Sequence, residues 1–252
     1  MTDYIIVPKT EPLPKDTNLL RQINDEVWKN HVFSYLMQYC KDVDKKEISK
    51  IIEQEKAEEM SNIEREIKKH IKKWFNRKRN ISFWLSGIKL KRETHSESYL
   101  EGFIDLEFFH SFWGNEPCMD KSFPFECKNI EAETKSKLNK SIKEYIYNPS
   151  KNDGGVYRYL TKKYSPEQDF GGMIGFLISG NLQKVIDKII KKLGALDISD
   201  KHIGKLTDNG VVINSIAGNK NTFNSTHNCY NYQNKMHSTV LLHHIIIDFQ
   251  SD

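Results

Sequence analysis

The spacing of apolar residues predicts two helices in the first third of the chain. Apolar residues recur every three or four positions between Leu19 and Cys40, which is the repeat of a helix with one buried face. A second stripe with this repeat crosses residues 46–73, where most other positions are Glu or Lys. Residues 1–16 hold three of the seven prolines and are expected to form an extended arm.

Short apolar segments after residue 80 predict strands, with helical patterns between some of them. The expected strands are residues 80–93, 99–109, 122–130, 171–179 and 238–249. The expected helices are residues 131–148, 156–164 and 181–194, the last with Asn181 as its N-cap. The polar, Asn-rich segment 219–235 is expected to be a loop. This order predicts an α/β fold with a mixed central sheet flanked by helices.

Composition narrows the class of protein only slightly. The chain has 38 Lys and Arg residues and 34 Asp and Glu residues, which gives a formal net charge of +4. This small excess permits a polyanionic partner but does not argue for one. No stretch approaches the roughly 20 apolar residues of a membrane span, and the N-terminus has no signal-peptide pattern. A cytoplasmic location with reduced cysteines and no membrane partner is therefore predicted. A zinc site at His227, Cys229 and His237 is less favoured than an ordinary polar loop.

Two of the expected strands carry charged residues where apolar ones would be usual. Asp105 lies in "GFIDLEFF", and Glu126 and Lys128 lie in "FPFECKNI". Burying a charge is costly unless it has a partner. Side chains alternate across a strand, so Glu126 and Lys128 point to one face, roughly 6.6 Å apart along the backbone.

Neighbouring strands would bring Asp105 and Glu126 to one edge of the sheet. Two converging carboxylates repel each other unless one is protonated or a cation lies between them. Carboxylate oxygens suit Mg²⁺, which takes one or two carboxylates together with water and phosphate oxygens. The residues therefore favour a magnesium site, in which Mn²⁺ would substitute. The competing interpretation is a charged edge strand, with Asp105 paired to an Arg and Glu126 to Lys128.

These motifs resemble those of the PD-(D/E)XK, or restriction-endonuclease-like, nucleases. The resemblance covers roughly residues 46–180 and rests on an Asp late in one strand followed by Glu-x-Lys in the next. It implies that Asp105 and Glu126 bind the metal, that Cys127 adds its backbone carbonyl, and that Lys128 is the catalytic lysine. A further acid from the preceding helix is implied, for which Glu59 and Glu66 both remain candidates.

The resemblance leaves the N-terminal helix and the last seventy or so residues unexplained, and the expected organisation of the chain places them around the core. Residues 1–45 would form an N-terminal arm and helix, and residues 46–180 the nuclease core. Residues 181–252 would complete the same domain with a helix, the Asn-rich loop and a final strand.

The function expected from these features is metal-dependent hydrolysis of phosphodiester bonds, with DNA favoured. The expected nucleic-acid contacts are basic residues after the Glu-x-Lys strand: Lys135, Lys137, Lys140, Lys143, Arg158 and Lys162. The Lys-, Asn- and Ile-rich composition fits a prokaryotic or phage source and the effector subunit of an anti-phage defence or restriction system, with a protein partner or as a homo-oligomer. The alternative is a non-catalytic interaction or scaffold subunit that retains a nuclease-like fold.

Overall fold

The computed structural model describes residues 17–58, 62–81, 88–95, 103–110, 122–164, 169–200, 204–207, 214–215, 220–231 and 236–250. The chain divides into two compact units, Met1–Gln38 and Tyr39–Asp252. The described part of the first unit is helical and belongs to α1 (Thr17–Asp42), as the apolar spacing predicts. The second unit contains the sheet and every other element.

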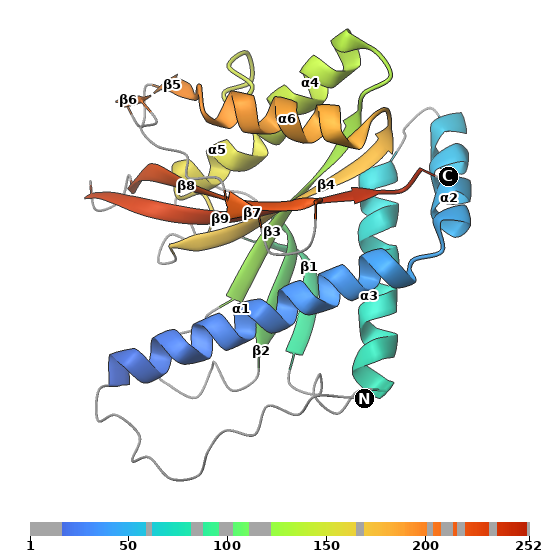
Figure 1. The fold of residues 1–252 in the computed structure, drawn as a ribbon, viewed down its shortest axis with the longest axis horizontal. Coiled ribbons are helices and arrows are strands. Elements are labelled where there is room, and N and C mark those ends of the chain that lie inside the picture. The colour runs from blue at the N-terminus through green and yellow to red at the C-terminus, as the bar shows by residue number, and fades with distance from the viewer. Residues whose placement is uncertain are drawn as a thin grey trace. The chain divides into compact units, whose positions relative to one another are not determined.

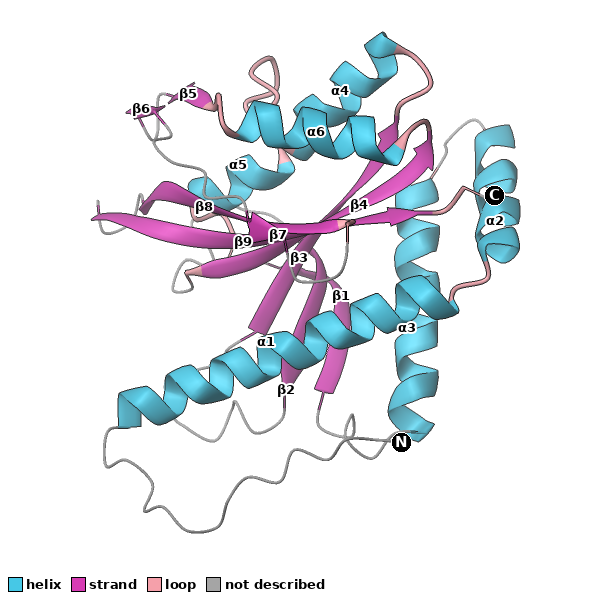
Figure 2. Cartoon of the chain, viewed as in Figure 1, coloured by secondary structure: helices cyan, strands magenta, loops and turns pink. Residues whose placement is uncertain are grey.

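The second unit is an α/β structure. Its helices are α2 (Lys45–Ala57), α3 (Ile63–Ile81), α4 (Lys135–Tyr145), α5 (Gly155–Leu160) and α6 (Leu182–Leu193). Its strands are β1 (Ile88–His95), β2 (Phe103–His110), β3 (Ser122–Glu131), β4 (Phe170–Ser179), β5 (Asp197–Asp200), β6 (Gly204–Thr207), β7 (Asn214–Ser215), β8 (Thr222–Asn231) and β9 (Met236–Asp248). Figure 2 separates these helices and strands by colour.

The central sheet is mixed and has the strand order β1-β2-β3-β4-β9-β8-β7. Strands β1, β2 and β3 form an antiparallel meander, whereas β3, β4 and β9 run parallel. Strand β7 contributes two residues, so six longer strands make up the body of the sheet. Strands β5 and β6 pair with each other and form a separate two-stranded sheet. The predicted mixed α/β sheet is thus confirmed.

Helices cover both faces of this sheet. On one face, α4, α5 and α6 pack over β3, β4 and β9 around a cluster that includes Tyr145, Ile189 and Leu242 (Figure 1). On the opposite face, Phe75 of α3 lies 5.0 Å from Phe108, measured between ring centroids. Since each face buries an apolar surface, the sheet holds the core between two helical layers.

Several elements differ from the sequence prediction, which does not include β5, β6 and β7. The helix predicted over residues 46–73 is two helices, because Glu58 is extended and the charged segment 53–58 has only Ala57 as an apolar side chain. The Asn-rich segment predicted as a loop contains β8, whose side chains from Phe223 to Cys229 are buried at every second position. Among the described helices, none is long and apolar enough to cross a membrane.

Candidate active site

Backbone pairing between β2 and β3 ends next to Asp105 and Glu126. Their register runs from Phe109↔Ser122 to Leu106↔Phe125. At the next position, the backbone amide of Cys127 donates a hydrogen bond of 2.8 Å to Oδ2 of Asp105. A carboxylate therefore joins the two strands at the point where the Glu-x-Lys motif begins.

Asp105 is buried and ionised. Its Oδ1 accepts a hydrogen bond of 2.5 Å from Nζ of Lys68, which lies on α3 and is itself 4% exposed. Burial opposes ionisation of Asp105, but the ammonium groups of Lys128 and Lys68 and the Cys127 amide outweigh it and hold the pKa below its usual value. The partner of Asp105 is a lysine rather than the arginine of the charged-edge interpretation.

Glu126 is completely buried and surrounded by donors. Its Oε1 lies 2.5 Å from Nζ of Lys128 and 2.8 Å from Nη1 of Arg158, and its Oε2 accepts a hydrogen bond of 2.7 Å from the Tyr164 hydroxyl. Burial raises the pKa of Glu126 to about 7, because loss of water and the charge of Asp105 outweigh the attraction of the two cations. Asp105 and Glu126 are thus close enough to repel each other.

Lys128 is attracted by the charges of both Asp105 and Glu126. Burial disfavours its charge, but Glu126, Glu64 and Asp105 together raise its pKa above the usual value. Its side chain is 18% exposed, whereas that of Glu126 is fully buried. The strand β3 lies between β2 and β4, so the Glu126–Lys128 pair is not a charged edge.

Arg158 of α5 and Tyr164, which follows the helix, are hydrogen-bonded to Glu126, and Asp153, which precedes the helix, pairs with Arg158. Arg158 forms a two-pronged pair with Asp153, with contacts of 2.8 and 2.7 Å, and donates a third hydrogen bond, of 2.6 Å, to the Tyr164 hydroxyl. Gly155 begins α5 directly against Glu126, since an added Cβ would lie 3.2 Å from Cγ of that residue. Helix α5 therefore fixes the position of the Glu126 carboxyl group.

The helix glutamate that approaches the cluster is Glu64. It lies 3.4 Å from Lys68, and burial raises its pKa against the attraction of Lys128. Glu66 pairs instead with Arg65 and Lys69, and Glu59 lies outside the described residues. The signal for Glu64 is its i,i+4 spacing to Lys68, which places the two on one helix face.

The expected nucleic-acid contacts do not form one exposed surface. Arg158 belongs to the acidic cluster, and Lys162 is 6% exposed. Lys137 pairs with Glu131 and Glu133 at 2.9 and 2.7 Å. The remaining three are exposed on α4: Lys135, Lys140 and Lys143.

The oxygen atoms of the cluster are of the kind that binds a hard cation. Asp105 and Glu126 offer carboxylate oxygens and Cys127 a backbone carbonyl, which are ligands that Mg²⁺ accepts alongside water. Each oxygen of both carboxylates already has a donor within the chain. Within the described ranges, no three His, Cys, Asp or Glu side chains form a ready-made metal site. Metal binding at Glu126 thus requires Lys128 or Arg158 to move.

No family model, curated protein or solved structure matches this chain.

Proposed function

We propose that this chain is a metal-dependent nuclease with a restriction-endonuclease-like core built on α3, β1–β4 and α4. The observation that carries the proposal is the meeting of two buried carboxylates and one lysine where β2 and β3 stop pairing. Such a concentration of buried charge costs folding stability and is typical of a functional site. The proposed setting is the effector subunit of a prokaryotic anti-phage defence or restriction system.

The chemistry assigned to the cluster is hydrolysis of a phosphodiester bond. A bound Mg²⁺ would polarise the scissile phosphate and lower the pKa of the attacking water. Asp105, Glu126 and the Cys127 carbonyl would hold the cation. The Lys128 ammonium group, kept protonated by the surrounding carboxylates, would stabilise the negative charge that grows on the phosphate.

A nucleolytic assay tests this proposal directly. The purified chain is incubated with duplex DNA, single-stranded DNA and RNA in Mg²⁺, Mn²⁺ or EDTA. We expect cleavage of DNA with either metal and none with EDTA. Asp105→Asn should abolish it, while Glu131→Gln, a change outside the cluster, should leave the rate unchanged. Equal cleavage by wild type and Asp105→Asn would refute the assignment.

One observation favours the alternative of a non-catalytic scaffold subunit. The cations and donors of the chain itself already engage every carboxylate oxygen of Asp105 and Glu126, as a purely structural polar cluster would require. A scaffold would show no response to Mn²⁺. Its Asp105→Asn variant would lose stability, because the buried charge of Lys68 would lose the nearest of its carboxylate partners.

A further inference from the structure

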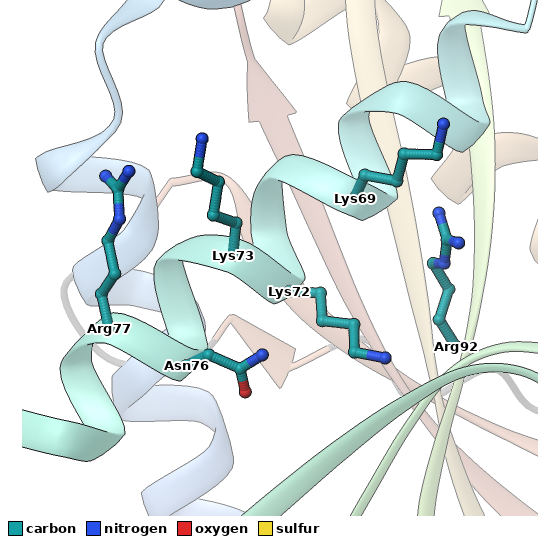
Figure 3. A pocket seen from close by; sticks show the side chains of 6 residues that line it. All are labelled: Lys69, Lys72, Lys73, Asn76, Arg77 and Arg92. Atoms are coloured by element: carbon teal, nitrogen blue, oxygen red, sulfur yellow. The ribbon is translucent and has the colours of Figure 1, made fainter.

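The outer face of α3 forms a hollow lined almost entirely by cations. The hollow has a volume of about 400 Å³, and its lining consists of Lys69, Lys72, Lys73, Asn76, Arg77 and, on β1, Arg92. Figure 3 shows these side chains spread along the helix, with Arg92 beside them on the neighbouring strand. The α3 members recur at intervals of three and four residues, so they share one face of the helix.

The buried face of α3 explains why the helix forms but not why its outer face is basic. Ile67, Ile71 and Phe75 are at most 1% exposed and face the sheet. An ordinary solvated face carries both signs of charge, as α2 does with four Lys and three Glu residues interspersed along it. Residues 68–79 of α3 contain seven Lys and Arg residues and no acid.

This charge pattern works against the stability of the helix. Lys69 and Lys73, and likewise Lys73 and Arg77, are like charges four residues apart, an arrangement that destabilises a helix. The helix dipole favours cations in the last turn only, so it does not account for Lys69 or Lys72. Among the described residues, no carboxylate forms an ion pair with Lys72, Lys73 or Arg77. Three cations therefore remain available to an anionic partner.

The hollow begins beside the candidate active site. Lys68 pairs with Asp105, and the next residue, Lys69, lines the hollow. From Lys69 to Arg77 the helix rises about 12 Å, at 1.5 Å per residue. One strand of B-form DNA places a phosphate about every 3.4 Å along the axis, so this length matches roughly three to four phosphates.

We propose that this basic face of α3 binds the sugar-phosphate backbone of nucleic acid and leads it to the Asp105–Glu126–Lys128 cluster. The inference rests on the proposed nuclease function and names the surface that holds its substrate. Among the described residues that line the hollow, none is aromatic or aliphatic and could stack on a base. The contact is therefore to phosphates and independent of sequence.

The test compares two triple variants that remove the same charge. One is Lys72→Gln, Lys73→Gln, Arg77→Gln on α3, and the other is a set of exposed lysines on α6, Lys184→Gln, Lys191→Gln, Lys192→Gln. Binding of a fluorescent mixed-sequence DNA duplex is measured in EDTA at several salt concentrations. We expect the α3 variant to bind at least about tenfold more weakly at 0.1 M salt. Its slope of log affinity against log salt should fall by about 2.7, at roughly 0.9 per lost phosphate contact.

The α6 variant is the matched control and should bind within about twofold of wild type. Both sets are on the surface, and thermal melts check that both variants fold. If the α3 triple variant fails to fold, Arg92→Gln and Lys72→Gln singly provide the same comparison. Equal losses in the two triple variants, or an unchanged α3 variant, would overturn the proposal. So would α3-dependent binding to vesicles of phosphatidylcholine and phosphatidylserine without binding to the duplex.

Failure of this inference is distinguishable from failure of the nuclease assignment. Binding that depends on α3, without cleavage in Mg²⁺ or Mn²⁺, would refute the catalytic assignment and leave the binding surface intact. Metal-dependent cleavage with an unchanged KM in the α3 triple variant would refute the binding surface alone.

Discussion

At the scale of single residues, the site depends on how Glu126 is kept buried. Its carboxyl group is removed from water and lies near the negative charge of Asp105, while Lys128, Arg158 and Tyr164 provide compensating donors. Loss of water and repulsion by Asp105 raise the pKa of Glu126 more than Lys128 and Arg158 lower it, so this pKa is about 7. Glu126 should therefore change its protonation state near neutral pH.

The first prediction follows from this raised pKa. In the unfolded chain Glu126 ionises near its ordinary value of 4.5, whereas in the folded protein it stays protonated up to about pH 7. The raised pKa thus stabilises the folded protein below pH 4.5, and that contribution is lost as the pH rises to about 7. Over this range we expect Glu126→Gln to gain up to about 3 kcal/mol of unfolding free energy relative to wild type, at roughly 1.36 kcal/mol per pKa unit.

Chemical denaturation of both proteins in EDTA, at half-unit steps from pH 4.5 to 8, measures this difference. Lys128 and Arg158 stay charged throughout, so any cost of leaving them beside an amide is a constant offset. The raised pKa would be contradicted if the unfolding free energies of the two proteins changed equally with pH. It would also be contradicted if wild type became more stable relative to the variant as the pH rises.

Lys128 carries the second prediction at this scale. If its ammonium group stabilises charge on the phosphate, Lys128→Ala should slow cleavage by about 10²-fold or more while affinity for DNA changes little. Lys128→Arg should not restore the rate, because a planar guanidinium cannot replace a compact ammonium group. Single-turnover rates and binding curves check both statements, with the exposed α6 variant Lys184→Ala as the control. A wild-type rate in Lys128→Ala would exclude the catalytic role.

Sequence alone identifies some of these residues and not others. Asp105, Glu126 and Lys128 could be identified because a charge within an apolar strand stands out against its flanks. Lys68 belongs to a basic helical segment where composition hides it, and Arg158 is expected from the sequence as a nucleic-acid contact rather than as a partner of Glu126. Their pairing with Asp105 and Glu126 joins positions 37 and 32 residues apart, which only the folded backbone brings together.

At the scale of elements, α5 controls the geometry of the cluster through a close approach to the sheet. A Cβ added at Gly155 would lie 2.4 Å from Cε of Met173 and 2.8 Å from the backbone oxygen of Tyr145. The second contact is to backbone and cannot be relieved by a rotamer change. Only glycine therefore allows α5 to hold Arg158 against Glu126.

The third prediction tests this approach with two glycines. Gly155→Ala should destabilise the protein by about 1–3 kcal/mol through overpacking, and should reduce cleavage because Arg158 shifts with α5. Gly194 is the matched control, since an added Cβ would meet only the Ile190 oxygen at 3.6 Å, and its φ is an ordinary −70°. Gly194→Ala should be neutral or slightly stabilising. Thermal melts of the two variants give the comparison, and equal melting temperatures would count against a tight α5 contact.

Elements with apolar stripes were predictable, whereas β8 was not. The polar composition of residues 222–231 indicates a loop, but Ser225 and His227 occupy buried positions in the strand. Ser225 lies 2.7 Å from His227 and 2.7 Å from His244 of β9, so its hydroxyl is satisfied by neighbours that only the sheet provides. Because buried polar groups of this kind are stabilised by tertiary hydrogen bonds, a hydrophobicity pattern does not reveal them.

At the scale of the whole site, the balance of charge links metal and nucleic acid. Five carboxylates face three cations: Glu64, Glu93, Asp105, Glu126 and Asp153 against Lys68, Lys128 and Arg158. With all of them ionised, the cluster has an excess of two negative charges, which repels a phosphate group. A divalent cation cancels that excess and removes the repulsion.

The fourth prediction is that metal and nucleic acid strengthen each other's binding. The Lys128→Ala variant allows binding to be measured without consuming the oligonucleotide. We expect Mn²⁺ to tighten its binding of a DNA duplex by about 5-fold or more relative to EDTA at matched ionic strength, a coupling of at least about 1 kcal/mol. Because such coupling is reciprocal, the duplex should tighten Mn²⁺ binding by the same factor.

Two controls show whether this coupling arises at the cluster. Adding Asp105→Asn to Lys128→Ala removes a proposed metal ligand and should abolish the Mn²⁺ effect. A duplex whose phosphates are replaced by uncharged methylphosphonates lacks the charge that the metal would balance, and it should show no gain from Mn²⁺. The α3 variant should bind the ordinary duplex more weakly yet keep the Mn²⁺ effect, because its cations lie outside the cluster. If Mn²⁺ and EDTA give the same affinity, the carboxylates hold no cation and the scaffold interpretation of the site is correct.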